Sequence, residues 1–429
     1  MKRILLAVFF ISNILCSQEK IIDTIQGTKQ NLDEVIVKGI RAKFSSPISY
    51  SNIYKDKLKN KNLGQDLPIL LNFLPSVVTT SDAGAGIGYT GIRVRGVSPQ
   101  STNITINGIP FNDPESMGTF WVNLPDFTSS VQSLQLQRGI GTSTNGSGAF
   151  GASINILTDN ISQTPYTEIS SSFGSFNTRK NTIKFSTGKI NDVFEFSGRF
   201  SKIDSDGYVD RAFSDLKSYF IQGTYLKGST LIKAISFAGH EKTYQSWYGL
   251  TMDQLKENRR QNPYTYENEI DNYKQDHYQL HWNEKINNFW SFNLGLNYTY
   301  GRGYFEQYRE DDNIDIYGGI VSSDTNLNGE KTDTTDLIRR RWLDNDFYVF
   351  NSSLNFVKNK IDLTISSSYS SYVGDHFGEV IWARTFSSNG KIRDRYYEGL
   401  GEKKDLSFFT KLLYSIDEKI EFYSDLQYR

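Results

Sequence analysis

Cysteine is nearly absent from this chain of 429 residues, since Cys16 is the only one. A single cysteine cannot close a disulfide within the chain, and it cannot build a cysteine-ligated zinc site. A surplus of charge of either sign is also missing, because 47 Lys and Arg stand against 48 Asp and Glu. This balance is far from that of a basic nucleic-acid-binding protein, so we expect no nucleic acid among the partners.

Long apolar runs are missing after residue 17. Without a run of about 18 apolar residues, the chain cannot be a helical membrane protein. A membrane β-barrel stays open, because its strands alternate apolar and polar residues instead. Near the start, Lys2 and Arg3 precede an apolar run from Ile4 to Ile11, Ser12 and Asn13 break the run, and Cys16 and Ser17 offer small residues for cleavage. This pattern predicts a secretory signal peptide over residues 1–17.

A catalytic constellation is missing as well. The chain has four histidines, which are scattered along it: His240, His277, His281 and His376. His277 and His281 share one face of an expected strand, which indicates polar side chains that face the lumen of a barrel. Catalytic and metal sites need convergent groups, and none are visible in the sequence. We therefore expect a protein that is not an enzyme, with no catalytic residue, no metal site and no cofactor.

One glycine pattern imitates a nucleotide site. Gly86, Gly88 and Gly91 have the G-x-G-x-x-G spacing of a dinucleotide-binding loop. That fingerprint requires a following helix, whereas residues 92–97 alternate apolar and charged side chains as a strand does. The sequence thus argues against a nucleotide and raises the question of what this flexible loop does.

Two segments with different sequence patterns follow the expected signal peptide. Residues 18–39 are polar and end in LDEVIVKG, which fits either an edge strand or an extended peptide offered to a partner for strand addition. Residues 40–160 predict a compact α+β unit. We expect its helix to begin with Asn62 as cap, to bury Leu67, Leu70, Leu71 and Leu74, and to end at Pro75. Its strands are expected at 91–97, 103–106, 131–137 and 152–157.

Residues 161–429 alternate apolar and polar side chains in segments of about ten residues. Short turns and long loops also alternate between the segments, which is the layout of an outer-membrane β-barrel. The last segment runs to Arg429 with no turn after it, so we expect the N-terminal part of a longer protein, with a partial transmembrane barrel. The eleven expected strands lie near 165–174, 180–189, 192–201, 217–227, 230–239, 276–285, 288–300, 346–357, 361–373, 405–415 and 419–429.

Two further stretches resemble the plug of the TonB-dependent outer-membrane receptors. They are IRVRGVSPQSTNITINGIPFNDPE at 92–115 and VQSLQLQRGIGTSTNGSGAFGASINILT at 131–158. The resemblance implies an antiparallel barrel of 22 strands, about half of them present here, with the α+β plug domain inside its lumen. The sequence departs from the family pattern at Gln132 and Gln135, where the family often has Glu, and at Asn107, where it has Asp.

The resemblance also implies a function and its residues. It implies energised uptake of a scarce ligand, with a ferric siderophore favoured and cobalamin, haem or a glycan as rivals; a passive porin or adhesin barrel is the alternative. The expected partners are a TonB-type inner-membrane protein, outer-membrane lipid and a small ligand such as a metal chelate. The glycine loop (84–91) is expected to rise toward the extracellular side. The implied residues are Asp33, Glu34, Val35, Ile36 and Val37 as the TonB box, Arg95 and Arg138 as a lock between plug and barrel, and Tyr89, Trp121, Tyr244, Trp247, Tyr248 and Tyr304 as ligand contacts.

Overall fold

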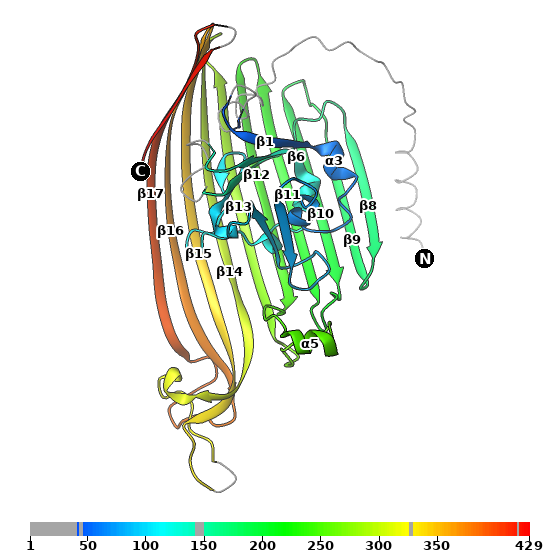
Figure 1. Ribbon diagram of the computed structural model, residues 1–429, viewed down its shortest axis with the longest axis vertical. Coiled ribbons are helices and arrows are strands. Elements are labelled where there is room, and N and C mark those ends of the chain that lie inside the picture. The colour runs from blue at the N-terminus through cyan, green and yellow to red at the C-terminus, as the bar shows by residue number, and fades with distance from the viewer. Residues whose placement is uncertain (1–40, 43–45, 142–149, 326–328, 418–419) are drawn as a thin grey trace, which may run out of the picture. The chain divides into compact units, whose positions relative to one another are not determined.

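A computed structural model describes residues 41–42, 46–141, 150–325, 329–417 and 420–429. The expected signal peptide at 1–17 and the TonB box at 33–37 lie outside these residues. The described part contains two sheets that face each other, one small and one large, and a separate two-stranded hairpin (Figure 1).

The small sheet belongs to the α+β unit expected at 40–160. Its strand order is β1-β6-β7-β4-β5, and all neighbours are antiparallel except β4 and β7. The bounds of the strands are β1 (Ser49–Tyr54), β6 (Val131–Arg138), β7 (Ala152–Thr158), β4 (Thr102–Ile106) and β5 (Ile109–Pro110), and the hairpin consists of β2 (Val77–Ser81) and β3 (Thr90–Val94). Short helices connect them: α3 (Lys55–Lys59), α4 (Leu67–Leu70), η1 (Pro99–Ser101), η2 (Trp121–Asn123) and η3 (Phe127–Ser130).

The central strands of this sheet are buried on both faces. Every residue of β4 and β7 is buried, which suits their content of Ile, Thr and Asn paired with neighbours. The hydrophobic core that surrounds them also includes Phe220, Ile235 and Phe237 of the large sheet. The plug and the large sheet therefore share one core, and the plug is seated on the inner face of that sheet.

The expected helix at 62–75 is only partly present. Leu67, Leu70, Leu71 and Leu74 are buried as predicted. However, α4 has four residues, and its N-cap is Asp66 instead of Asn62. Pro68 lies in the first turn of α4, where its missing N–H leaves no helical hydrogen bond unmade. A helix that began further upstream could not continue through this proline.

The large sheet contains the eleven expected strands in sequence order, each antiparallel to the next (Figure 1). Short turns join the strands at one end, and long connections join them at the other, including α5 (Met252–Glu257) between β12 and β13. The strands are β8 (Tyr166–Gly174), β9 (Thr178–Ser186), β10 (Phe194–Ser205), β11 (Ser214–Lys227), β12 (Thr230–Tyr244), β13 (Ile270–Lys285), β14 (Trp290–Asn313), β15 (Thr334–Lys358), β16 (Ile361–Ala383), β17 (Arg395–Ser415) and β18 (Glu421–Tyr428).

Several strands are longer than their alternation predicts. β15 begins at Thr334, although alternation indicates a start near residue 346, and β14 continues to Asn313 instead of ending near 300. The added residues lie at the end with the long connections. They carry runs such as Ile338–Trp342 with three arginines, because a strand beyond the lipid does not need an apolar outer face.

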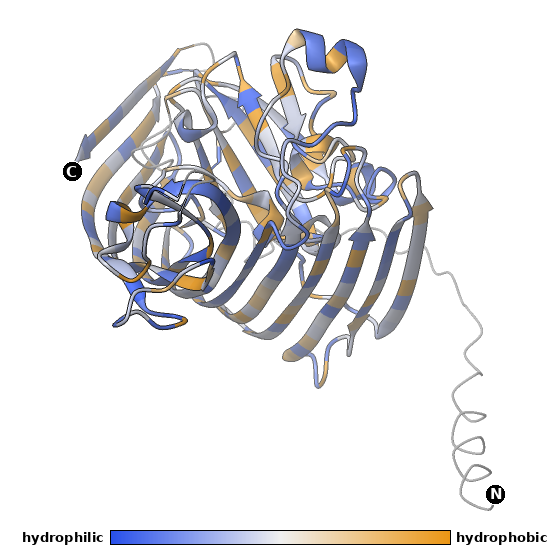
Figure 2. Ribbon diagram, turned by 90° about the horizontal axis from the view of Figure 1, so that it is seen from below, coloured by the Kyte–Doolittle hydropathy of each residue, from blue (hydrophilic) through white to orange (hydrophobic). Residues whose placement is uncertain are grey.

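The two faces of the large sheet differ as the sequence predicts. Apolar side chains such as Leu296, Phe350 and Ile365 are exposed on the outer face, while Asn297 and Thr299 are buried on the inner face. The alternation is visible along the strands in Figure 2. His277 and His281 are both buried on the inner face, as expected. The large sheet therefore has the apolar exterior and polar interior of an outer-membrane barrel wall.

None of the helices in the described residues is long and apolar enough to cross a membrane.

Candidate ligand-binding cleft and plug contacts

The glycine loop of residues 82–89 joins β2 to β3 and meets the end of the large sheet that carries the long connections. The Tyr208 amide donates a hydrogen bond of 2.8 Å to the Ala83 carbonyl. Gly84 has a φ of +74°, and a Cβ there would lie 2.9 Å from Cβ of Tyr208. Glycine thus supplies both the backbone conformation and the close approach. Gly91 belongs to β3 and not to the loop, which corrects the expectation that all four glycines act together.

Tyr89 ends this loop and connects it to the large sheet. Its hydroxyl donates a hydrogen bond to Asp271 of β13 and lies 3.5 Å from a carboxylate oxygen of Glu241 in β12. Its ring packs edge-on against Trp247, with ring centroids 5.4 Å apart. Burial and the neighbouring carboxylates raise the pKa of Tyr89 well above its ordinary value. The phenol therefore remains a hydrogen-bond donor.

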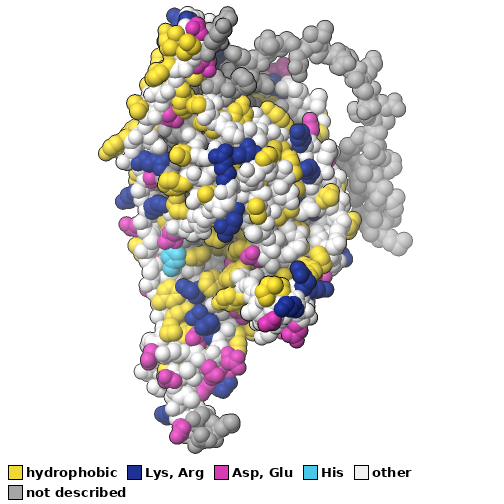
Figure 3. Space-filling view, in the orientation of Figure 1, with side chains coloured by type: hydrophobic (Ala, Val, Ile, Leu, Met, Phe, Trp, Pro, Cys, Tyr) yellow, Lys and Arg dark blue, Asp and Glu magenta, His cyan; other side chains and the backbone are white. Residues whose placement is uncertain are grey.

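A cleft opens beside Tyr89, between the plug segment 111–120 and strands β12 to β15. Aromatic rings form much of its lining, and Arg341 of β15 lies among them. The Arg341 guanidinium stands 5.5 Å from the ring centres of Phe305 and Tyr397, and its Nε donates a hydrogen bond of 3.2 Å to the Tyr397 hydroxyl. Figure 3 shows hydrophobic and basic side chains mixed on this face of the molecule. The lining residues with rings or charges are Tyr89, Phe111, Phe120, Tyr273, Tyr304, Phe305, Asp113, Glu241, Asp271 and Arg341.

This arrangement can hold a ligand in two ways. The flat rings offer stacking surfaces that bury apolar area. The carboxylates and the guanidinium offer directional hydrogen bonds to polar groups of the ligand. Neighbouring Tyr304 is itself covered by Arg340 at 4.2 Å, and Arg340 is paired with Glu306 at 2.8 Å. The ring of Tyr304 is thus held in place before any ligand arrives.

Two of the expected ligand contacts line the cleft, namely Tyr89 and Tyr304. Trp247 lies behind Tyr89 and also packs edge-on against Phe305, so it supports the lining without being part of it. Tyr248 is 61% exposed and stacks on Tyr264 in the long connection after β12. The structure therefore brings together only part of the expected set.

The structure argues against two expected contacts. Trp121 is 2% exposed, and it belongs to the core that the plug shares with the large sheet. Tyr244 is 4% exposed, and its hydroxyl donates to the Tyr266 carbonyl within a cluster that includes Tyr264 and Ile270. Both side chains are committed to packing, and neither can reach a ligand without unfolding its surroundings.

Other residues that line the cleft were not predicted from the sequence. Phe111 and Phe120 bracket a turn-rich stretch of the plug, and Tyr273 and Phe305 lie on strand ends beyond the alternating region. The run of three arginines at 339–341 was the one available signal for Arg341. The cleft forms only because the plug segment 111–120 folds against strands more than 100 residues away, as in the 5.4 Å approach of the Phe111 ring to the His277 ring.

Buried ion pairs join the plug to the first strands of the large sheet. Asp126, at the start of η3, pairs with Lys180 of β9 at 2.6 Å and lies 3.7 Å from Arg199 of β10. Thr182 and Ser201 donate further hydrogen bonds to this carboxylate, each of 2.7 Å. Burial alone would raise the pKa of Asp126, but Arg199 and Lys180 outweigh it and hold that pKa well below its ordinary value.

A second ion pair lies nearby. Asp159, just after β7, contacts Lys184 of β9 and also pairs with Lys55 of α3 at 2.6 Å. Burial again works to raise the pKa of Asp159, and the two lysines lower it overall. In both pairs the plug supplies the carboxylate and the strands supply a cation.

Arg95 and Arg138 were expected to have the opposite polarity, with plug cations meeting barrel carboxylates. Arg138 donates to the Pro75 carbonyl at 3.2 Å and to the Ser51 hydroxyl at 2.9 Å, both within the plug. Arg95 is exposed and has a left-handed φ of 55°. Within the described residues neither arginine forms an ion pair with a carboxylate. Their role as a lock therefore stays a prediction.

Comparison with known proteins supports the assignment of the plug. Residues 42–153 match the family model described as the TonB-dependent Receptor Plug Domain.

Two curated relatives are similar over part of the chain. One is described as a probable TonB-dependent siderophore receptor, PirA, of Acinetobacter baumannii, and it is 24% identical over 190 residues, covering 42% of this chain and 23% of that protein. The other is described as the ferric enterobactin receptor PirA of Pseudomonas aeruginosa, and it is 26% identical over 192 residues, covering 41% of this chain and 26% of that protein. The matches span about a quarter of the length of these relatives.

Solved structures share the fold. One, described as the copper transporter OprC, superposes with a TM-score of 0.67 at 12% identity, covering 90% of this chain and 56% of that one. At this identity the likeness concerns the fold alone. A matching plug domain, relatives from one receptor family and a plug seated on a wall of antiparallel strands agree with one another, and together they support a TonB-dependent outer-membrane receptor.

Proposed function

We propose that this protein takes up a ferric siderophore across the bacterial outer membrane, with energy from a TonB-type protein of the inner membrane. The observation that carries the proposal is the cleft lined by Tyr89, Phe111 and Tyr304, which combines plug and strand residues. A ligand bound there touches the plug directly, so binding can be communicated to the part that must move. Two relatives described as siderophore receptors support the choice of ligand.

Energy coupling is assigned to residues 33–37, which lie outside the described residues. An extended DEVIV segment can add as a strand to a sheet edge of the partner, and backbone hydrogen bonds then transmit a pull. The plug would follow that pull through residue 41, where Arg41 donates hydrogen bonds of 2.9 Å to the Asn155 carbonyl of β7 and to the Ser133 hydroxyl of β6. A pull on the N-terminal segment would therefore load the centre of the plug sheet first.

Arg95 and Arg138 are proposed as a second contact between plug and barrel. Both lie at the strand ends where the chain turns, and burial together with the nearby Arg95 lowers the pKa of Arg138. Two neighbouring guanidinium groups repel each other, so an incoming carboxylate would relieve the repulsion.

A passive porin or adhesin is the rival function, and a plug seated through buried ion pairs argues against it. The receptor family consists of transport proteins and not enzymes, which supports the inference that the chain has no catalytic role. Cobalamin, haem or a glycan could use the same aromatic surfaces, so the ligand must be decided by experiment.

Transport in a bacterial host that lacks its own siderophore receptors tests the proposal. Cells that express the full-length protein should grow on ferric enterobactin under iron limitation only when TonB is present. Ile36→Pro removes a backbone donor and should abolish growth while surface binding persists, whereas Ile36→Val should behave as the parent. Growth in cells without TonB would contradict energised uptake, and growth on cobalamin or haem alone would reassign the ligand.

A further inference from the structure

A second cavity lies between the plug turn at residues 103–114 and the inner face of β13 to β17. It contains about 190 Å³ of space. Because one water needs on the order of 10–15 Å³ by this measure, the cavity has room for roughly 13 to 19 waters or for part of a ligand.

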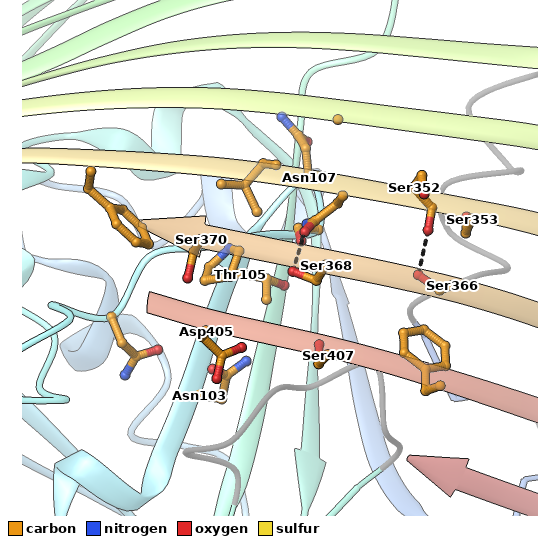
Figure 4. A pocket seen from close by; sticks show the side chains of 18 of the residues that line it. Asn103, Thr105, Asn107, Ser352, Ser353, Ser366, Ser368, Ser370, Asp405 and Ser407 are labelled. Atoms are coloured by element: carbon orange, nitrogen blue, oxygen red, sulfur yellow. Dashed lines mark hydrogen bonds between the residues drawn. The ribbon is translucent and has the colours of Figure 1, made fainter. Parts of the chain in front are cut away.

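Many side chains in the walls of this cavity are neutral hydrogen-bonding groups, which lie among apolar residues such as Leu294 and Phe347 and the charged residues Asp113, Lys403, Asp405 and Arg429. Figure 4 shows serine hydroxyls of β15, β16 and β17 opposite plug residues Asn103, Thr105 and Asn107. Alternate residues of each strand face inward, and the strand register sets them side by side: Ser353 is opposite Ser366, and Asn351 is opposite Ser368. The polar lining is thus a feature of three adjacent strands and not of a single side chain.

Some of these groups have no protein partner. Asn283 is 1% exposed, and its side-chain nitrogen has no hydrogen-bond partner among the described residues; the side-chain oxygen of Asn293 has none either. Buried amides are almost always hydrogen-bonded, and an unmade bond costs about 1–3 kcal/mol. The cavity must therefore hold water or the polar groups of a solute.

The cavity and the ligand-binding cleft are separate spaces that lie in series. A small space lies between them, and it is lined by Phe111, Phe347 and Tyr372. Asp113 belongs to the lining of all three spaces. The plug segment 109–117 thus runs along the whole line, and a modest movement of that segment would merge the three spaces.

Few contacts hold segment 109–117 against this wall. Glu115 accepts a hydrogen bond of 2.9 Å from Tyr372 and lies 2.7 Å from His376. Lys403 donates to the Pro114 carbonyl at 2.7 Å. Glu115 and His376 are about one-third exposed, so solvent weakens their pairing. The opposite wall at β9 and β10 instead holds the plug through buried ion pairs.

We propose that the transported solute passes along the wall formed by β13 to β17, from the aromatic cleft past segment 109–117 into the serine- and asparagine-lined cavity. The cavity accepts a solute that presents hydroxyl, amide or carbonyl groups, since its walls can exchange hydrogen bonds with such groups in many positions. The proposal rests on the proposed function for its direction, and it adds the route and the segment that moves.

Cysteine accessibility tests the route without any siderophore. Ser368→Cys lies in the cavity wall at a half-buried position, and Ser197→Cys lies at a buried position of β10 on the opposite wall. Each variant of the full-length protein would be exposed, in intact energised cells, to the membrane-impermeant reagent trimethylammonium-ethyl methanethiosulfonate. Because only Cys16 is native and it lies in the expected signal peptide, the background is low. We expect the Ser368→Cys variant to react at least about tenfold faster than the Ser197→Cys variant, since the plug must open locally to expose the latter thiol.

A second variant tests whether the reagent passes segment 109–117. Glu115→Ala, added to Ser368→Cys, removes the contacts with Tyr372 and His376 and should raise the rate of modification about threefold or more. Glu310→Ala removes an exposed carboxylate outside the segment and should leave the rate unchanged. If Ser368→Cys does not fold, Ser407→Cys on β17 lines the same cavity and gives the same test.

Each outcome of these experiments either supports or overturns the proposed route. Equal rates for the Ser368→Cys and Ser197→Cys variants, or no effect of Glu115→Ala, would overturn it. Fast modification of the Ser368→Cys variant in cells that fail to import ferric enterobactin would retain the route and reject the siderophore as ligand, so the two proposals fail separately.

Discussion

The plug meets two walls of the large sheet, and the walls differ in chemistry. Along β9 to β12 it is held by buried ion pairs at Asp126 and Asp159 and by a shared apolar core that includes Phe237. Along β13 to β17 it faces a cavity whose walls carry many serine and asparagine side chains, and it is held mainly by hydrogen bonds such as Asn351 to the Gly108 carbonyl, at 2.9 Å. A buried ion pair is costly to break, whereas neutral contacts exchange readily with water. The difference indicates which side of the plug is fixed and which can move.

The largest effect is expected from breaking the fixed side. Asp126→Ala leaves Lys180 and Arg199 buried without their partner, and such a stranded charge costs about 3–5 kcal/mol. The plug should lose protection from hydrogen exchange at residues 124–130, and large antibiotics should enter the cells. The exposed Asp375→Ala serves as control and should change neither property. An Asp126→Ala variant with unchanged exchange would show that the ion pair does not anchor the plug.

A second prediction compares two buried aspartates of the plug. Asp66 lies under the glycine loop with a hydrogen bond of 2.9 Å from Thr90 but with no ion pair among the described residues, and burial raises its pKa to about 8. Its folded pKa thus exceeds its unfolded value of 3.8, so the stability of the loop should fall as the pH rises from about 4 to 8. Asp126 behaves oppositely, because its lowered pKa stabilises the plug above the ordinary pKa of an aspartate and the contribution is lost at lower pH.

Hydrogen exchange of residues 82–90 measures the difference. Asp66→Asn keeps the shape of the side chain and removes its titration. The variant should therefore be more protected than the parent at pH 8 and similar to it at pH 4. The difference in stability between the two proteins should be at most about 1.4 kcal/mol for each unit by which the pKa is raised. If the parent is better protected than the variant at pH 8, a cation must neutralise Asp66 after all.

The third prediction concerns the contact between the glycine loop and the ligand-binding cleft. Tyr89→Phe keeps the ring but leaves the carboxylates of Asp271 and Glu241 without their donor, a loss of about 1–3 kcal/mol. Affinity for ferric enterobactin should fall while the protein remains folded, as measured by binding to cells at low temperature. Tyr248→Phe changes an exposed ring outside the cleft lining and should leave affinity unaltered. Equal losses in both variants would remove Tyr89 from the binding site.

The smallest effect is expected from the mobile side. Glu115→Ala breaks a partly exposed pair with His376, which is worth about 0–1 kcal/mol. The thermal stability of the full-length protein should stay within experimental error of the parent. A destabilisation as large as that of Asp126→Ala would abolish the contrast between the two walls.

Much of the fold could be predicted from the sequence. The eleven strands of the large sheet and their inner and outer faces follow from a period of two and from turn residues, because lipid on one side and a polar lumen on the other force strict alternation. Of the plug strands, β3, β4, β6 and β7 were predicted, whereas β1, β2 and β5 were not. The strand ends beyond the lipid could not be predicted, since the requirement for strict alternation no longer applies there. The length of α4 was overestimated because the leucine spacing continues across Pro68, where the helix itself cannot extend upstream.

The site was less predictable than the fold. Tyr89 and Tyr304 line the cleft, although their contact with a ligand stays a prediction, whereas Trp121 is a core residue, and nothing in its local sequence distinguishes a core tryptophan from an exposed one. The partners of Asp126 come from strands that are 54 and 73 positions away, so their pairing depends on how the plug is seated. Contacts between distant segments carry no periodic signal, which is why the charge pattern of the two walls emerged only from the structure.

Hydrogen exchange of two plug segments in the full-length protein tests the difference between the walls most directly. Residues 124–130 pack on the fixed side and residues 109–117 on the mobile side, and both are largely irregular or short helical segments. We expect amides of 124–130 to exchange markedly more slowly than those of 109–117, and an energised TonB partner to accelerate exchange at 109–117 first. Equal protection of the two segments, or earlier opening of 124–130, would contradict a plug that is fixed on one wall and mobile on the other.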